Sequence, residues 1–409
     1  MKLRALIAAA CLAVAAPAAF VAAPASHAAT LPPGNTAQQW EKIAEDAAVG
    51  AGAFQGEAFL YIAYASAAMD RATNPGQRNG QSPDAAVAEA AFDVLDHYFP
   101  GQDANLTALR DASLAMVPDG AAKRNGIMYG DLAAARVIRE RADDGLQTPA
   151  ASTSTFPTLA PGPGVWRLTP SAFAAPQTPW MATMRPFIMR SADQFLPPPP
   201  PSLQSQQWVD AFNEVKSLGA ANSTTRTAEQ TAIAQFWAAN VNRQWGILVR
   251  NIATQEGLDV AQSAHWFAMV NETLADAGIA FMNAKYHYLF WRPVTAIDPT
   301  SVKSDGFGPV PGFDDGNPLT QEQTGWRPLL TTPNHPEYPS AHATFTSAIA
   351  EVLTRFLGTP NIDVDVQGTT SFNVTRHFAT ADDLRAEVEN ARVWAGLHFR
   401  FSVEAGAAL

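Results

Sequence analysis

Two cations in the second half of the chain could bind a buried anion. Lys285 and Arg292 are seven residues apart, a spacing that returns an ideal helix to within about 20° of the same face. A solvated basic stripe would explain this pair by itself. Because the residues between them are mostly aromatic, we expect the two cations to face a buried anion near the end of a helix.

A second cluster follows a proline. Ser340 and His342 lie in the segment Tyr-Pro-Ser-Ala-His-Ala-Thr, directly before a run with helical periodicity. The first turn of a helix carries free N–H groups and a partial positive charge, so such a turn can bind an oxyanion. Plain helix capping by Ser340, with His342 exposed, is the alternative for this segment taken alone.

The third cluster is Arg392 and His398, six residues apart. On an ideal helix they would point about 120° away from each other. They can address one site only if the helix bends or is interrupted, and Gly396 permits such a distortion. An ordinary amphipathic helix is the alternative. Taken together, the three clusters supply three cations, a hydroxyl and two imidazoles, which is the composition of an oxyanion site with two bases.

The other histidines outside the first 28 residues are weaker candidates. His97 and His265 lie within amphipathic segments, and we expect them to serve packing or the surface without partners nearby. His287 and His377 stay open. A metal site built from paired Glu-x-x-His helices is not expected, because the sequence has no such pair.

Composition limits the function classes. The 409 residues are 47% hydrophobic and 16% charged, and the net charge is −11. A large core is therefore possible, and a nucleic-acid partner is not expected. Lys2 and Arg4 precede an apolar run that ends before Ser26-His27-Ala28, a pattern typical of a secretion signal. We expect a secreted, extracytoplasmic protein without a membrane span, and one without cysteine chemistry because Cys11 lies inside the signal.

The elements that must position these side chains are mostly helices. Apolar residues recur at three- and four-residue intervals, which predicts helices over 40–53, 59–69, 87–99, 132–138, 206–218, 228–239, 244–254, 260–291, 341–356 and 382–409. Residues 298–339 are expected to form a loop, and 362–374 a small hairpin. The expected organisation is a signal over 1–28, a helical region with an ordered Pro/Thr-rich crossover over 29–196, a proline linker over 197–203, and the site-bearing bundle over 204–409.

The three clusters carry a family resemblance. Lys-x6-Arg-Pro at 285–293, Pro-Ser-x-His at 339–342 and Arg-x5-His at 392–398 occur in this order. Their order and separation resemble the signatures of the vanadium haloperoxidase and type 2 phosphatidic acid phosphatase superfamily, and the aromatic flanks look like its secreted haloperoxidase-type members. The resemblance implies an all-α fold of one or two four-helix bundles, with the anion held between helices and a long Pro-rich crossover.

The resemblance also implies residue roles. Lys285, Arg292 and Arg392 would neutralise the oxygens of vanadate, or of phosphate in its place, and Ser340 with the Ala341 N–H would complete the cradle. His398 would bond to vanadium, or act as the nucleophile of a phosphatase. His342 would be the acid–base group.

The first hypothesis is a secreted vanadate-dependent haloperoxidase. Its partners would be hydrogen peroxide, a halide and a small organic substrate, and Lys285 would polarise the peroxide oxygen that the halide attacks. His335 is similar to the bromoperoxidase pattern, although a plain loop histidine beside Pro336 is equally compatible. A secreted acid phosphatase that hydrolyses a phosphate monoester is the second hypothesis. A non-catalytic anion-binding homologue is the third.

Two positions depart from the family pattern. Ala341 replaces the usual glycine, and its methyl group could crowd the anion. Ser402 stands where the family often has an acidic residue that orients the last histidine. A neutral serine would raise the basicity of His398 less than a carboxylate does, which counts against the phosphatase.

Overall fold

The computed structural model describes residues 29–73, 80–147, 159–160, 162–302, 314–369 and 374–409. The expected secretion signal at 1–28 lies outside the described residues, as does part of the expected crossover at 148–158. Within the described part, the all-α prediction is confirmed: helices dominate, and the two strands are short. No helix in these ranges is long and apolar enough to cross a membrane.

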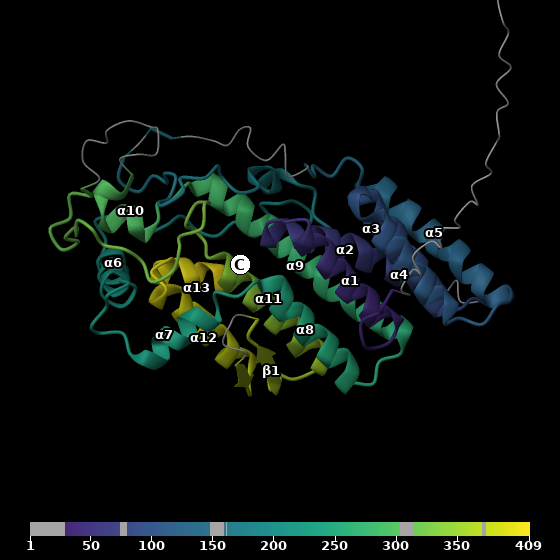
Figure 1. Cartoon of the computed structure of the whole chain (residues 1–409). Helices are drawn as coiled ribbons and strands as arrows, with labels where there is room; N and C mark the ends of the chain where they lie inside the picture. The colour runs from purple at the N-terminus through teal and green to yellow at the C-terminus, as the bar shows by residue number, and fades with distance from the viewer. Residues whose placement is uncertain (1–28, 74–79, 148–158, 161, 303–313, 370–373) are drawn as a thin grey trace, which may run out of the picture.

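The helices gather at two ends of an elongated molecule (Figure 1). One end holds α1 (Thr36–Gly50), α2 (Gln55–Ala72), α3 (Pro83–Tyr98), α4 (Asp103–Ala115) and α5 (Ala121–Arg141). The other holds α6 (Gln206–Leu218), α7 (Ala228–Phe236), α10 (Pro293–Ile297), α12 (Ala381–Trp394) and α13 (Arg400–Ala408). Between them lie α8 (Val241–Gln255), α9 (Val260–Tyr288) and α11 (Ala341–Leu357).

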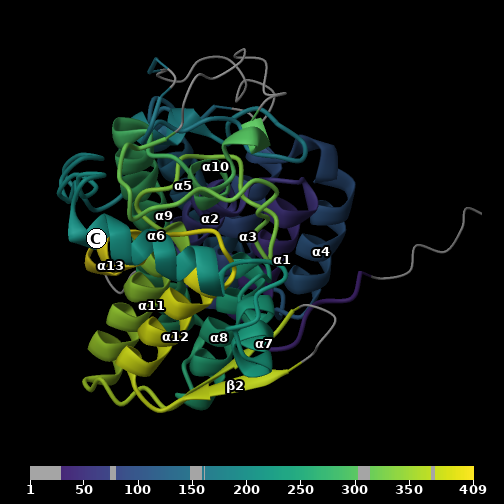
Figure 2. The same ribbon diagram turned by 90° about the vertical axis from the view of Figure 1, so that its left-hand side faces the viewer.

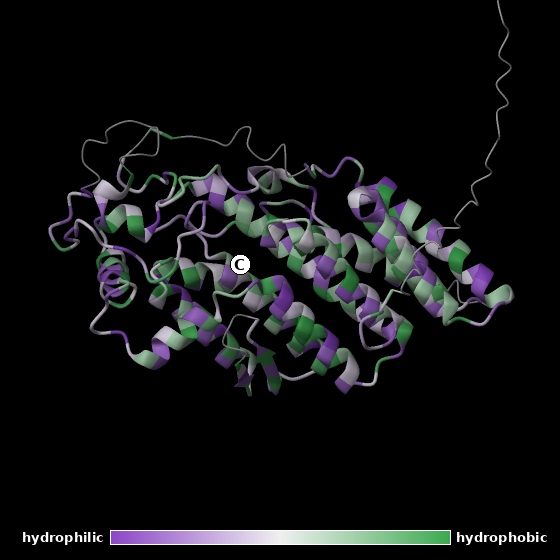
Figure 3. Ribbon diagram, viewed as in Figure 1, coloured by the Kyte–Doolittle hydropathy of each residue, from purple (hydrophilic) through white to green (hydrophobic). Residues whose placement is uncertain are grey.

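Helix α9 joins the two ends. Its 29 residues contact α1, α2, α11 and the short 3-10 helix η4 (Pro179–Thr183). Asp259 determines where it begins: its side chain accepts from the N–H of Gln262, and the Gln262 side chain accepts from the N–H of Asp259. Figure 3 shows that hydrophobic and hydrophilic residues are interspersed along the helices.

Close helix contact at the N-terminal end depends on glycine. A Cβ atom on Gly130 of α5 would lie 2.6 Å from the Glu89 Cβ atom and 2.8 Å from the Ala86 carbonyl oxygen of α3. Only a residue without a side chain permits this approach. Helix α4 was not among the predicted helices, although its buried Leu106 and Leu109 have helical spacing.

The C-terminal part corrects two predictions. The helix predicted over 260–291 ends at Tyr288, because Leu289 adopts a left-handed conformation (φ 49°) and Pro293 starts α10. The helix predicted over 382–409 is interrupted between Trp394 and Arg400 at Gly396 (φ 77°). In Figure 2, α11 and α12 lie side by side, and α7 packs against α12.

The predicted hairpin forms, with its second strand later than expected. Strand β1 (Val364–Gln367) pairs antiparallel with β2 (Thr375–Phe378), and Val364 lies opposite Phe378. The prolines of the expected linker are held in place by tyrosines: the Tyr288 hydroxyl donates to the Pro197 carbonyl and the Tyr338 hydroxyl to the Pro198 carbonyl. The division of the chain at 197–203 stays a prediction.

Candidate active site

The structure brings the three clusters together. Lys285 lies in the last turn of α9, and Arg292 is the residue before α10. Ser340 precedes α11, and Arg392 lies in the last turn of α12. His398 lies in the connection between α12 and α13. The expectation that Lys285 and Arg292 share one helix face is wrong, because α9 has ended before Arg292; the chain turn, not helix periodicity, directs both cations to the site.

Arg292 is the centre of the cluster. Its guanidinium is fully buried and donates from Nε to the His335 carbonyl (3.0 Å) and from Nη1 to the Leu397 carbonyl (2.9 Å). Nη1 also lies 3.2 Å from His398 Nε2, and Nη2 lies 3.0 Å from His335 Nδ1. One side chain therefore joins the loop before α11 to the connection before α13.

These contacts determine the tautomer of His398. An arginine side chain only donates hydrogen bonds, so His398 Nε2 accepts from Arg292 and the ring carries its proton on Nδ1. His335 Nδ1 lies 3.0 Å from Arg292 Nη2, a donor, and 3.1 Å from the Pro336 carbonyl, an acceptor, so its two contacts favour opposite tautomers. Burial lowers the pKa of both rings well below the usual range, and the charges of Arg292 and Lys285 lower it further.

The sequence analysis missed the carboxylate of this site. Glu337 is fully buried, and its Oε1 accepts from His398 Nδ1 (2.9 Å) and from the Phe399 N–H (3.0 Å). The expectation that His398 has only the neutral Ser402 as a partner is wrong, since Ser402 Oγ lies farther from Nδ1, at 3.3 Å. The one available signal was the position of Glu337, three residues before Ser340 in the same loop.

Lys285 holds the loop that precedes α11. Its Nζ donates to the carbonyls of Pro336 (2.9 Å), Glu337 (2.9 Å) and Pro339 (2.5 Å), which accounts for all three of its protons. Burial lowers the pKa of Lys285 well below its usual value; Arg292 lowers it further and Glu337 opposes the change. In this arrangement Lys285 contributes charge and loop geometry rather than a free donor.

Two polar groups beside the first turn of α11 have no hydrogen-bond partner among the described residues: Ser340 Oγ and Arg392 Nε. Plain capping does not account for Ser340, because its side chain makes no capping hydrogen bond to α11. Arg392 is anchored by Nη1, which donates to the Trp237 carbonyl (3.0 Å). Burial, together with the charge of Arg292, lowers the pKa of Arg392 to about 9. Both orphaned groups suit a bound oxyanion.

The site opens into a cavity of about 400 Å³. Its wall includes His335, Ala341, His342, Arg392 and His398 from the C-terminal part, and residues 52–56, which form the turn after α1 and the first residues of α2. Phe54, Phe281 and Phe345 give it an aromatic lining. His342 is therefore not an exposed residue, and burial with three nearby cations lowers its pKa well below the usual value.

The buried charges are unbalanced in a way that fits an oxyanion cofactor. Lys285, Arg292 and Arg392 are all buried; Glu337 is the carboxylate that acts on Lys285 and Arg292, and Arg392 has no carboxylate partner among the described residues. Burial raises the pKa of Glu337 to about 7, and the two nearest cations, Arg292 and Lys285, oppose the rise. Buried cations need a compensating anion. The donor set, which includes two arginines, a free hydroxyl and a helix N-terminus, is that of a tetrahedral oxyanion site.

The remaining histidines lie elsewhere. His97 and His287 make edge-on ring contacts with Tyr98 and Tyr288. The expectation that His265 has no partner is wrong, because its Nδ1 lies 3.1 Å from an Asp70 oxygen at the surface. His377 is exposed on the hairpin, 3.0 Å from Asp365. None of these four belongs to the described lining of the cavity.

Comparison with known proteins finds relatives among the vanadium haloperoxidases. Residues 265–409 match the family model described as the VCPO second helical-bundle domain. The vanadium chloroperoxidase of Curvularia inaequalis is 28% identical over 270 residues; the alignment covers 50% of this chain and 43% of that protein. The chain thus spans less than half the length of this curated relative.

Solved structures resemble the whole fold. A bacterial vanadium-dependent iodoperoxidase superposes with a TM-score of 0.73 at 22% identity, covering 92% of this chain and 95% of that one. The holo form of a bacterial vanadium-dependent chloroperoxidase gives a TM-score of 0.63 at 17% identity, covering 89% of each chain. At such identities the likeness establishes the fold.

Proposed function

We propose that this chain, which belongs to the vanadium haloperoxidase and type 2 phosphatidic acid phosphatase superfamily, oxidises halide with hydrogen peroxide at a vanadate held by His398. The observation that carries the proposal is the charge imbalance: among the described residues of the site, three buried cations are accompanied by one buried carboxylate, Glu337, beside a cavity lined by histidines. An anion bound there would be held by desolvated, charge-assisted hydrogen bonds.

The side chains of the site would have different roles in holding the anion. Arg292 and Arg392 would hold the anion oxygens, and Ser340 Oγ with the first N–H groups of α11 would complete the cradle. Lys285 would add positive charge while its donors hold the loop in place. Vanadate, when bound, supplies a Lewis-acid centre that activates peroxide without a change of oxidation state.

The histidines have distinct tasks. His398 presents the Nε2 lone pair toward the guanidinium of Arg292, and this nitrogen would bond to vanadium. His342 lines the cavity as a neutral imidazole, suited to take a proton from peroxide and return it to the leaving oxygen. His335 lies beside Arg292 and lines the same cavity, and we propose it as the side chain that faces the halide.

The cavity has room for more than the cofactor. About 400 Å³ lies within the range of small-molecule sites. Phe54 reaches it from the turn before α2 and packs 5.9 Å from the His335 ring, centroid to centroid. A small, electron-rich organic compound fits this aromatic wall, and we propose it as the acceptor of the oxidised halogen.

Acid phosphatase activity is a second candidate because of Glu337. A nucleophilic histidine needs a basic Nε2, and the buried carboxylate at Nδ1 supplies the partner that Ser402 cannot. A phosphate monoester would then bind where vanadate does. A non-catalytic anion-binding homologue is the third candidate. Ala341 supports this candidate, because its side chain lines the cavity at a position where the family usually has glycine.

We also propose that the protein is exported, on the strength of the basic and apolar pattern over 1–28. The N-terminal sequence of protein recovered from the producing cells tests this. Export is supported if the recovered chain begins near residue 29, and a chain that keeps residues 1–28 contradicts it.

One experiment separates the three functions. Protein freed of phosphate is assayed for oxidation of iodide, bromide and chloride by hydrogen peroxide, with and without orthovanadate, and for hydrolysis of a generic phosphate monoester. A His398→Ala variant serves as the control in both assays. Halide oxidation that needs vanadate and His398 supports the peroxidase. Hydrolysis that vanadate inhibits, without halide oxidation, supports the phosphatase; binding of either anion without turnover supports the non-catalytic homologue.

A further inference from the structure

We propose that Glu337 is the positioning residue of His398: its carboxylate keeps the ring in the Nδ1–H form and leaves the Nε2 lone pair for the bound anion. The inference rests on the proposed function in assigning Nε2 to the anion. In this chain the carboxylate that orients the histidine comes from Glu337 in the loop before α11, and position 402 has a serine.

The Glu337 carboxylate accepts hydrogen bonds from both the His398 ring and the main chain. Glu337 Oε1 accepts from His398 Nδ1 at 2.9 Å and from the Phe399 N–H at 3.0 Å. Because the two donors belong to adjacent residues, one oxygen atom fixes the imidazole relative to its own backbone. A ring held in this way loses rotational freedom before the anion arrives, which lowers the entropic cost of binding.

Arg292 enforces the same tautomer from the opposite side. Its Nη1 lies 3.2 Å from His398 Nε2 and can only donate. A proton on Nε2 would face that donor directly, so the only arrangement that satisfies both neighbours is Nδ1–H with a free Nε2 lone pair. His398 is thus set between a carboxylate and a guanidinium, both fully buried.

Glu337 is itself held by its main chain. Its N–H donates to the Phe290 carbonyl (2.9 Å), and its carbonyl accepts from Lys285 Nζ (2.9 Å). The residue therefore links the end of α9, the loop before α11 and the connection before α13. A displacement of Glu337 would move Lys285 and His398 together.

Ser402 is explained by the presence of Glu337. Its Oγ lies 3.3 Å from His398 Nδ1, and its hydroxyl acts on the Glu337 carboxyl to lower the pKa of that group. An acidic residue at 402 would place a second buried negative charge next to the first, which is unfavourable. Serine at 402 supports the carboxylate rather than replacing it.

The first test observes His398 directly in protein without any bound anion. Nitrogen-15 NMR distinguishes protonated from unprotonated ring nitrogens, so wild-type His398 is expected to show a protonated Nδ1. Glu337→Gln should keep this form, because the amide oxygen is still held by two donors. Glu337→Ala should yield a mixture of tautomers. A wild-type spectrum with the proton on Nε2 overturns the inference, whatever reaction the protein catalyses.

The second test measures affinity for orthovanadate and for inorganic phosphate by calorimetry. Glu337→Gln keeps the hydrogen bond to Nδ1 but replaces the carboxylate by a neutral amide, so Nε2 becomes less basic; altering an outer partner of a metal-bound histidine typically costs about ten- to a hundredfold in affinity. The double variant Glu337→Gln/Ser402→Asp returns a carboxylate to the ring from α13, and we expect it to recover most of that loss. Glu41→Gln, which neutralises a buried glutamate that Asn271 and Ser66 contact in the N-terminal part, is the matched control and should bind as wild type does.

The outcomes are separable from those of the proposed function. If neither halide oxidation nor hydrolysis is found, the tautomer and the phosphate affinity still report on Glu337. Unchanged affinity in folded Glu337→Gln overturns the inference. Reduced affinity that the double variant does not recover also overturns it, because a purely structural role of Glu337 would give that result.

Discussion

Arg292 Nη1 lies 3.2 Å from Nε2 of His398, the nitrogen that the proposed function assigns to the anion. The guanidinium thus occupies the immediate neighbourhood of the expected bond between His398 and vanadium. Anion binding requires this N–H to turn from the ring to an anion oxygen, which leaves the lone pair of Nε2 available. The same two atoms explain why His398 is neutral and why it needs a partner at Nδ1.

Arg392→Met should weaken the binding of phosphate and vanadate without weakening the fold. The variant removes one of three neighbouring buried cations, and hydrogen bonds between charged groups are worth about 1.5–3 kcal/mol, or roughly ten- to a hundredfold in affinity. The anion-free protein should unfold at an equal or higher urea concentration, since a desolvated charge is gone. Arg400→Met, which breaks a surface pair with Glu214, should leave affinity unchanged; equal losses in both variants would refute the assignment.

Ser340→Ala, too, should weaken anion binding without weakening the fold. Ser340 Oγ is buried without a partner among the described residues, so its removal should stabilise the anion-free protein by about 1 kcal/mol. Affinity for phosphate should fall about tenfold, as expected for one lost hydrogen bond to an anion. Ser347→Ala removes another unpartnered hydroxyl of α11 and should leave affinity unchanged. Calorimetry and urea unfolding measure both effects, and unchanged affinity in Ser340→Ala would exclude the hydroxyl from the cradle.

Gly396→Ala should damage both the fold and the site. Gly396 has φ 77°, and a Cβ atom there would lie 2.5 Å from the Gly219 carbonyl oxygen and 2.8 Å from Pro328 Cβ. We expect a loss of about 2 kcal/mol or more in the free energy of unfolding, together with weaker phosphate binding, because His398 lies two residues on. Gly358→Ala has a similar φ of 71° but open space around it, so it should cost about 1 kcal/mol. Equal costs would mean that the contact with Gly219 is unimportant.

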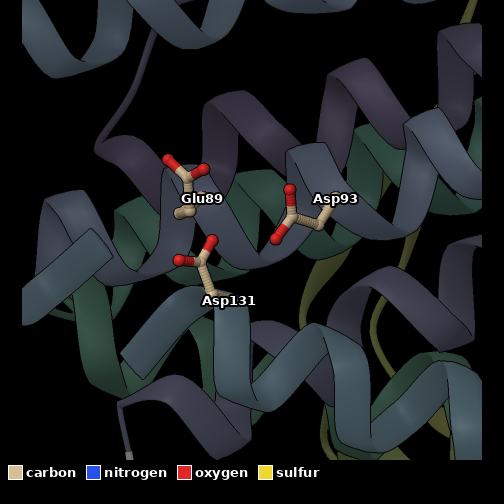
Figure 4. A group of neighbouring side chains, drawn as sticks. All are labelled: Glu89, Asp93 and Asp131. Atoms are coloured by element: carbon tan, nitrogen blue, oxygen red, sulfur yellow. The ribbon is translucent and has the colours of Figure 1, made fainter. Parts of the chain in front are cut away.

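Asp93→Asn should stabilise the protein at alkaline pH. Glu89, Asp93 and Asp131 lie close together between α3 and α5 (Figure 4). Burial raises the pKa of Asp93 to about 7, and the charges of Glu89 and Asp131 contribute. A raised carboxyl pKa favours folding below its unfolded value near 4, and this contribution is lost as the pH rises through 7.

The free energies of unfolding of wild type and Asp93→Asn, measured with urea, should therefore change relative to each other between pH 5 and pH 8. The variant should gain roughly 1–2 kcal/mol over wild type in this interval, less than the full shift implies because the group is partly exposed. Asp119→Asn, a substitution in a surface pair with Lys123, controls for net charge. A constant difference between pH 5 and pH 8 would contradict the assignment to Asp93.

The local sequence was sufficient to predict most of the helices. Asn35, Asp259 and Thr380 each form a capping box with the residue three positions later, and such caps need only their own neighbours. The three motifs, with their cations, Ser340 and two histidines, were also readable, because residue type and order along the chain are local information. Their convergence on one site followed from the combined pattern rather than from any single motif.

Tertiary structure decided the rest. Helix α12 stops before His398 because Gly396 meets the backbone of Gly219, more than 170 residues away. Arg292 faces the site from beyond the end of α9. Residues 52–56, far away in the sequence, form part of the cavity wall. Glu337 became visible only as a contact of His398, since no spacing along the chain relates them. Such pairings depend on which distant segments approach each other, and a buried carboxylate and a buried histidine each need a hydrogen-bond partner that only the folded chain supplies.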